Sequence, residues 1–199
     1  MTEIADLQMP DDADTLRRLT DRLGRAAEAA DLLDVAYRTV DSPLGRLLLA
    51  ATPRGIVRVA FETETEDEVL DELAARVSPR VLADARRLDP AAREMEEYFA
   101  GRRRDFDLAI DLTLVMGFRR EVVQLLPTIP YGRTASYAEL AAMAGNPGAT
   151  RAVGTACARN PVPLVLPCHR VVRSDGTTGA YRGGPEAKTA LLQLELAHL

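Results

Sequence analysis

The spacing of apolar residues changes along the chain, and this change limits the possible folds more than any other feature. Between residues 36 and 61, short β-rich runs alternate with turn sequences, whereas from Gly117 onward apolar residues recur at helical spacing. The expected strands are residues 36–40, 46–51 and 56–61. The sequence therefore predicts an α/β (α+β) fold, in which a small N-terminal antiparallel sheet with helices precedes a mostly helical C-terminal domain.

Further elements are expected in the first part of the chain. A helix is predicted at about residues 66–77. A second helix should begin with Asp89 as its N-cap and Pro90 at its first position, and should end before Gly101. Residues 106–112 alternate apolar side chains with polar or small ones, which predicts another strand.

The second part of the chain contains a candidate helix-turn-helix. Helices are expected at residues 118–126, at 137–144 with Ser136 as N-cap, and at 149–158. The last two are joined by a short turn that contains Gly145, and in a helix-turn-helix the second helix lies against DNA. Helix pairs of this kind also occur in ordinary helical cores, so this pattern alone leaves DNA binding open.

The N-terminal residues resemble neither a signal peptide nor a membrane anchor. Residues 1–10 are acidic, and no apolar stretch approaches the roughly 20 residues that span a bilayer. Residues 11–34 have the apolar spacing of an amphipathic helix, which either packs on the main body or binds a partner. We expect a cytoplasmic protein without membrane contact, divided into a helical extension (1–34), a sheet-and-helix domain (35–112) and a C-terminal domain (113–199).

Few side chains are available to bind a metal, and the charge is unevenly distributed. The two cysteines and two histidines, Cys157, Cys168, His169 and His198, lack the paired spacing of a zinc site, so neither a metal nor another cofactor is expected. Residues 1–100 carry 13 basic and 22 acidic side chains, and residues 101–199 carry 12 and 8. This asymmetry is compatible with a basic working surface in the second half.

A possible nucleophile lies in the apolar segment at residues 161–172. This segment leads through Pro167 to Cys168, which His169 and Arg170 follow directly. A reactive cysteine needs a base or positive charge close by. A free cysteine is also often a small buried hydrophobic residue, and on these residues alone both interpretations stay open.

Several ordered blocks resemble the O6-alkylguanine-DNA alkyltransferases, also called methylated-DNA–protein-cysteine methyltransferases. The block around the cysteine is Pro167-Cys168-His169-Arg170-Val171. The other blocks are Ile129-Pro130-Tyr131-Gly132, Ser136-Tyr137, Asn146-Pro147, Arg151-Ala152-Val153-Gly154, Asn160-Pro161, Gly183-Gly184, and Lys188 through Glu195. The resemblance is strong over residues 113–199 and general over 35–112, whereas 1–34 look like an addition.

The resemblance implies DNA repair by a single, self-inactivating alkyl transfer from O6-alkylguanine, and also from O4-alkylthymine, to Cys168. It implies that His169 relays a proton through water to Glu195, which would raise the thiolate fraction. Tyr137 would donate a proton to guanine N3, and Asn160 would hold the active-site turn. Two ordinary structural roles are the alternatives: Tyr137 as a core tyrosine, and Glu195 as a solvated carboxylate on the last helix.

The resemblance also implies how the protein meets its substrate. As a monomer it would bind the minor groove of double-stranded DNA and flip the damaged base, with Arg151 filling the vacated space. Close approach would involve Thr150, Ala149 and Gly154. The base pocket would be formed by Val171, whose carbonyl accepts from guanine, and by Tyr181, Arg182 and Pro163. Ala180 and Pro185 depart from the family pattern in the loop at 179–185, which leaves the range of alkyl groups open.

Three other functions are possible for this chain. A silent alkyltransferase-like protein that only marks lesions usually lacks the cysteine, so Cys168 argues against it. A helix-turn-helix regulator that senses methylation would need a separate sensor domain, for which the N-terminal extension offers a single helix. A Cys–His hydrolase would need a distant histidine as base, and His198 is the one that remains.

Overall fold

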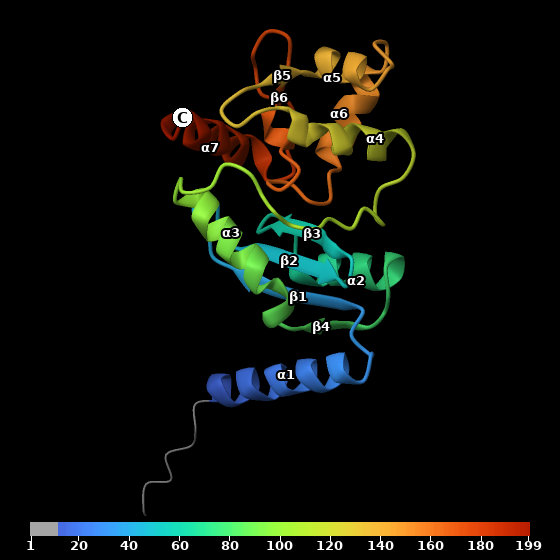
Figure 1. Ribbon diagram of the computed structural model, residues 1–199, viewed down its shortest axis with the longest axis vertical. Helices are drawn as coiled ribbons and strands as arrows, with labels where there is room; N and C mark the ends of the chain where they lie inside the picture. Colours follow the sequence, from blue (N-terminus) through green and yellow to red (C-terminus); the bar gives the residue numbers. More distant parts are fainter. Residues whose placement is uncertain (1–11) are drawn as a thin grey trace, which may run out of the picture.

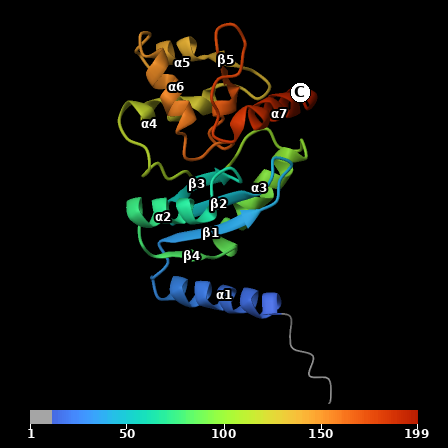
Figure 2. The same ribbon diagram turned by 180° about the vertical axis from the view of Figure 1, so that it is seen from behind.

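The computed structural model describes residues 12–199, so the acidic residues 1–10 lie outside it. The described chain forms three tiers in both views (Figures 1 and 2): a long helix at one end, a sheet with helices in the middle, and a helical region at the other end. We call residues 35–112 the sheet region and residues 117–197 the helical region. No helix among the described residues is long and apolar enough to cross a membrane.

The sheet has four strands in the order β3-β2-β1-β4. The first three, β1 (Val35–Val40), β2 (Leu47–Thr52) and β3 (Gly55–Phe61), pair antiparallel as expected. The fourth strand, β4 (Val81–Ala83), pairs parallel with β1, so the expected antiparallel sheet gains a parallel edge strand and is mixed. Three residues are too few for an alternating pattern, and α2 (Glu66–Arg76) supplies the crossover that parallel pairing requires.

The predicted strand at 106–112 does not form. Its backbone makes only an isolated bridge, in which Ile56 donates to Ala109 and Asp111 donates to Ile56, both at 2.8 Å. The approach is close enough that a Cβ at Gly55 would lie 2.2 Å from the Ala109 carbonyl oxygen. The apolar residues of this segment pack on the core without joining the sheet, which explains why they alternate.

Helices cover both faces of the sheet. Alternate residues of β2 face opposite ways: Leu47 and Leu49 belong to a core shared with α3 (Asp89–Phe99), whereas Leu48 packs with residues of α2. Thr65 and Glu68 form a capping box at the start of α2. The expected N-cap of α3 was wrong, because a 3-10 turn at Arg86–Leu88 leads straight into the helix and Leu88 precedes its first residue.

The helical region confirms the expected helix-turn-helix. Its helices are α4 (Phe118–Leu125), α5 (Tyr137–Met143), α6 (Thr150–Ala158) and α7 (Gly184–Ala197). Ser136 caps α5 in a capping box with Glu139, and Gly145 turns the chain toward α6 with a φ of +71°. Two short strands that the sequence did not indicate, β5 (Ala135–Ser136) and β6 (Val171–Val172), pair parallel beside the site described below.

The N-terminal helix α1 (Asp12–Ala29) lies next to β4 (Figure 1). It contacts the body near its C-terminal end, where Ala27 is buried and Leu33 of the following turn is also buried. Leu16, Leu19 and Leu23 of its apolar face are 56–66% exposed. The expected packing on the main body therefore holds for the end of the helix only.

Candidate active site

Cys168 is the first residue of a 3-10 turn, Cys168–Arg170, at the end of the apolar segment. Its side chain is buried. Asn160, which is also fully buried, donates from Nδ2 to the Leu166 carbonyl at 2.7 Å and to the Cys168 sulfur at 3.2 Å. The Asn160 Oδ1 accepts from the Val162 backbone at 3.1 Å. One asparagine thus fixes the segment at both ends and supplies the sulfur with a hydrogen-bond donor.

The Cys168 thiol is protonated at rest. Burial raises its pKa to about 11, although Asn160 and Lys188 act in the opposite direction. The sequence-based expectation of a raised thiolate fraction therefore does not apply to the unliganded protein. Burial also raises the pKa of Cys157, which lies in α6. A nucleophilic role for Cys168 would require the loss of this proton.

His169 and Glu195 form a buried pair. The His169 Nε2 lies 2.8 Å from the Glu195 Oε1, and neither side chain is exposed. Burial opposes ionisation of Glu195, but hydrogen bonds from His169, Arg170 and Gly132 lower its pKa to about 2. A carboxylate only accepts hydrogen bonds, so Nε2 carries a hydrogen. Burial lowers the pKa of His169, which leaves the ring neutral and Nδ1 available to accept a proton.

His169 Nδ1 has no hydrogen-bond partner among the described residues, although it is buried. A buried ring nitrogen of this kind needs a partner, and a bridging water between Nδ1 and the thiol would provide one. The expected relay placed a water between His169 and Glu195, but these two side chains are in direct contact at 2.8 Å, so a water could take part only between the Cys168 thiol and Nδ1.

Tyr98 and Arg170 also hold Glu195, a role that the sequence did not predict for either residue. Arg170 donates from Nε and Nη2 to the carboxylate at 2.9–3.1 Å, and the Gly132 backbone donates at 2.9 Å. Tyr98, on α3 of the sheet region, donates from its hydroxyl to Oε1 at 2.8 Å. No local pattern marks Tyr98, because its role depends on a contact between segments 97 residues apart in the sequence.

Lys188 is a third residue that sequence reasoning missed. It is fully buried on α7, and its Nζ donates to the Val171 carbonyl at 2.5 Å and to the Tyr137 hydroxyl at 3.5 Å. The Val171 carbonyl, expected to accept from guanine, thus already accepts from Lys188, and its second lone pair remains for the base. The signal that could have revealed it is a lysine within a helix that is otherwise rich in alanine and leucine.

Tyr137 lies at the first position of α5, half-buried beside the two thiols. Burial and the nearby Cys157 and Cys168 raise the pKa of its hydroxyl to about 12, so it holds its proton. A Cβ added at Gly179 would lie 2.1 Å from the Tyr137 oxygen, which shows how closely the loop at 179–185 approaches the hydroxyl.

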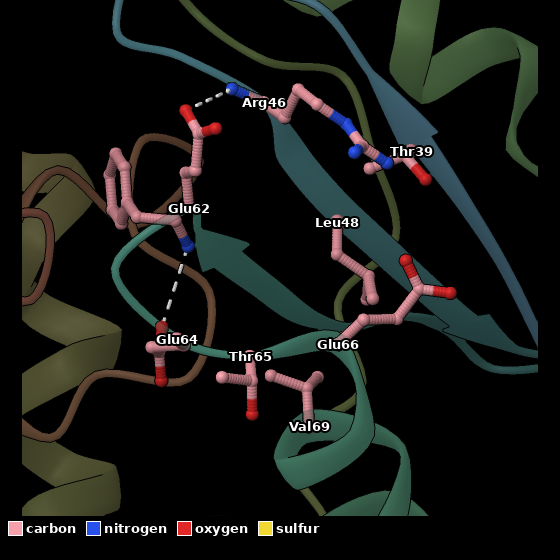
Figure 3. A pocket seen from close by; sticks show the side chains of 9 residues that line it. Thr39, Arg46, Leu48, Glu62, Glu64, Thr65, Glu66 and Val69 are labelled. Carbon is pink, nitrogen blue, oxygen red and sulfur yellow. Dashed lines mark hydrogen bonds between the residues drawn. The ribbon is translucent and has the colours of Figure 1, made fainter.

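The remaining pocket residues lie on the loop and on the apolar segment. Tyr181 and Pro163 are buried, and the Tyr181 ring meets His169 edge-on with centroids 6.3 Å apart. Arg182 donates to Glu64 of the sheet region at 2.8 Å. A cavity of about 180 Å³ in the sheet region (Figure 3) is lined by Glu64 and its neighbours and does not include Cys168.

The four residues expected to meet DNA lie on the first five residues of α6 and at its N-cap, Ala149, apart from the buried cluster. Thr150 and Arg151 are exposed, and Ala149 and Gly154 are half-buried. A Cβ at Gly154 would meet nothing within 4 Å, so packing inside the protein does not require a glycine there. No group of three or more metal-ligating side chains occurs in the described part of the chain.

The fold and site together define a class of protein: a buried cysteine beside a buried His–Glu pair, carried by a helix-turn-helix body. Comparison with known proteins agrees with this class. Residues 117–197 match the model of the 6-O-methylguanine DNA methyltransferase DNA-binding domain, and residues 35–112 match that of the ribonuclease-like domain of the same proteins.

Curated relatives and solved structures are also similar. A methylated-DNA–protein-cysteine methyltransferase of Mycolicibacterium paratuberculosis is 40% identical over 82% of this chain and 94% of its own length. The bifunctional transcriptional activator/DNA repair enzyme Ada of Escherichia coli is 36% identical over 98% of this chain, which matches 56% of Ada. The Mycobacterium tuberculosis O6-methylguanine methyltransferase structure is 37% identical, with a TM-score of 0.73 over 83% of this chain and 94% of that chain. The chain belongs to the methylated-DNA–protein-cysteine methyltransferase family.

Proposed function

We propose that the protein repairs DNA by moving an alkyl group from O6 of guanine, and from O4 of thymine, to its own Cys168. The observation that carries this proposal is the buried thiol with Asn160 on one side and the His169–Glu195 pair on the other. Family membership supports the reaction class, and a similar Mycobacterium tuberculosis protein has been solved in complex with DNA.

The proposed reaction is an in-line displacement at the alkyl carbon. As the base enters, the Cys168 proton passes through water to His169 Nδ1, and Glu195 stabilises the imidazolium that forms. The new bond joins sulfur to the alkyl carbon, and the bond from that carbon to O6 breaks. The departing guanine takes a proton at N3 from Tyr137, so neutral guanine remains in DNA. The thioether has no leaving group of comparable quality, so each chain reacts once.

We propose that the exposed start of α6 enters the minor groove as part of a monomer. Thr150, Ala149 and Gly154 would allow close approach, and Arg151 would fill the space that the flipped base leaves. Val171, Tyr181, Arg182 and Pro163 would surround the base. In this proposal residues 113–199 bind DNA and carry out the transfer, residues 35–112 support them, and residues 1–34 are an added helical extension. We also propose that the protein is cytoplasmic.

The test is transfer from duplex DNA that contains radiolabelled O6-methylguanine. We expect one methyl group per chain, on the peptide that contains Cys168, as located by mass spectrometry. Cys168→Ala should take up no label, and Cys157→Ala, which removes the other thiol, should react normally. Label on Cys157, or no label on protein, would refute the proposal. Binding without transfer would favour a silent lesion-marking protein.

The same assay separates the two remaining alternatives. A regulator that senses methylation would take up one methyl group and afterwards bind a specific DNA sequence more tightly, whereas we expect weak sequence preference before and after transfer. A thiol hydrolase would release the methyl group and turn over repeatedly, so label would accumulate in solution.

A further inference from the structure

A buried arginine in the sheet region has no part in the proposed reaction. Arg58, on β3, has a side chain that is 1% exposed. Its guanidinium pairs with Glu64 and, at 3.4 Å, with Glu72. It also donates to the carbonyl oxygens of Val59 and Pro161, and Pro161 begins the apolar segment that leads to Cys168. Arg58 therefore reaches from the sheet region to the segment that carries the nucleophile.

Glu64 links this arginine to the loop at 179–185. Its Oε2 accepts from Arg58 Nη2 and, at 2.8 Å, from Arg182 Nε. Its Oε1 accepts from the Phe61 backbone at 3.4 Å, as the dashed line to Glu64 in Figure 3 shows. Arg182 also lies 3.9 Å from Glu72, so two arginines and two glutamates form one balanced network. We call Arg58, Glu64, Glu72 and Arg182 the charge network.

The Phe61 ring packs against Tyr181 and Gly183, the residues on either side of Arg182. The Phe61 and Tyr181 rings meet edge-on with centroids 5.5 Å apart. On the other side of Arg182, a Cβ at Gly183 would lie 2.8 Å from the Phe61 ring. The Thr63 hydroxyl also donates to the Arg182 carbonyl at 3.5 Å. The end of β3 and the segment that follows it therefore fix three successive loop residues.

Stability alone is a poor explanation for the charge network. Charges that are removed from water gain little net stability from pairing, and apolar residues of similar size often serve as well. Such a network instead fixes the orientation of its side chains, because a guanidinium held by two carboxylates has a defined orientation. In this arrangement Arg182 is committed to Glu64 and Glu72, and is directed away from solvent toward the sheet region.

We propose that Glu64 is a positioning residue that holds the loop at 179–185 closed over the flipped base, so that the sheet region sets how tightly the pocket fits the alkyl group. This inference rests on the proposed function, since it assumes that Tyr181 and Arg182 cover the base. It assigns the sheet region a part in substrate fit that goes beyond supporting the fold. Free O6-benzylguanine should depend most on it, because a free base has no DNA contacts to hold it in place.

The experiment compares Glu64→Gln with Glu66→Gln. Glu66 lines the same cavity (Figure 3), and no pairing with Arg58 or Arg182 is found for it among the described contacts. We expect Glu64→Gln to lower the rate constant for free O6-benzylguanine about tenfold and that for methylated duplex DNA about threefold or less. Hydrogen exchange should become faster at 179–185 and stay unchanged at 161–168. Glu66→Gln should behave as the wild type in each measurement.

A double-mutant cycle separates positioning from a general loss of stability. Arg182→Gln should reproduce the loss with the free base, and the double variant with Glu64→Gln should be no worse than the poorer single variant. Arg182→Gln leaves the Arg58–Glu64 pair in place, so it keeps the test valid if Glu64→Gln fails to fold. Additive losses, or wild-type rates in Arg182→Gln, would overturn the inference. A wild-type protein that takes up no alkyl group would refute the proposed function instead.

Discussion

At the scale of single residues, Glu195 is the most heavily constrained group in the site. Its two oxygens accept from His169, Arg170, Gly132 and Tyr98, which come from three separate places in the chain. The motif around Cys168 made His169 predictable, and the block at 188–195 made Glu195 predictable. Tyr98, Lys188 and Arg58 were not predictable, because their partners are distant in sequence and only the folded chain brings them together.

Tyr98→Phe tests whether the sheet region contributes to the proton relay. Burial raises the pKa of Tyr98, so its hydroxyl stays a donor to Oε1, the oxygen that His169 also uses. We expect transfer to slow about tenfold and the midpoint of its pH dependence to rise, because Oε1 loses the hydroxyl that fixes its position toward His169 and then stabilises the imidazolium less well. The measurement is the single-turnover rate with O6-benzylguanine from pH 5 to 9.

Tyr131→Phe is the matched control for that variant. The Tyr131 ring packs against Tyr98 at 6.2 Å, and its buried hydroxyl has no hydrogen-bond partner among the described residues. Its removal should leave both rate and midpoint unchanged. Equal effects in the two variants, or a midpoint that moves to lower pH in Tyr98→Phe, would contradict the assigned role of the Tyr98 hydroxyl.

Glu195 should also make the fold sensitive to acid. Its pKa of about 2 lies below the ordinary value of 4.5, so its ionisation stabilises the folded state above pH 4.5, and this contribution is lost as the pH falls toward 2. We expect the difference in unfolding free energy between wild type and Glu195→Gln to shrink by about 2 kcal/mol between pH 6 and pH 3. Urea unfolding at pH 6, 4 and 3 measures it. Glu186→Gln, exposed on the same helix, is the control, and a constant difference would show that Glu195 is not held as a carboxylate.

At the scale of elements, local signals predicted most of the fold. Capping and turn residues such as Ser136 and Gly145 act within a few neighbours, so the helix-turn-helix was readable from the sequence. The strand β4 and the segment at 106–112 were not, because pairing depends on a partner elsewhere in the chain. An alternating pattern reports burial on one side, which a packed loop shares with a strand.

Helix α6 gives a prediction at this scale. Arg151 is exposed at its start, so Arg151→Ala should cost little stability and should leave reaction with free O6-benzylguanine unchanged. Repair of duplex DNA should fall at least tenfold, because base flipping loses the side chain that replaces the base. Arg159→Ala, at the other end of α6, removes the same charge. Equal losses on duplex DNA in both variants would mean that Arg151 contributes charge alone.

At the scale of the whole molecule, the reaction should weaken the fold. One core runs from the sheet region through the helical region and includes Cys168, so an added carbon must be fitted into close-packed surroundings. Overpacking of this kind costs about 1–3 kcal/mol, or about 2–10 °C in melting temperature for a chain of this size. We expect the methylated protein to melt below the free form and the benzylated protein lower still.

Scanning fluorimetry on the three forms tests this prediction. Cys168→Ala treated with O6-benzylguanine is the control, and its melting temperature should not move. An unchanged or higher melting temperature after alkylation of the wild type would show that the pocket accommodates the product without strain.

The protonated, buried thiol also determines how long an unused molecule lasts. Under the proposed function each chain reacts once, so a reaction with any other electrophile would inactivate it permanently. Cys168 is 1% exposed, with a pKa of about 11, so soluble electrophiles meet neither an open path nor a thiolate. In the proposed mechanism, the thiol becomes reactive only when a base occupies the pocket. The amount of unreacted protein therefore declines with the number of lesions repaired, and hardly at all with time in the absence of lesions.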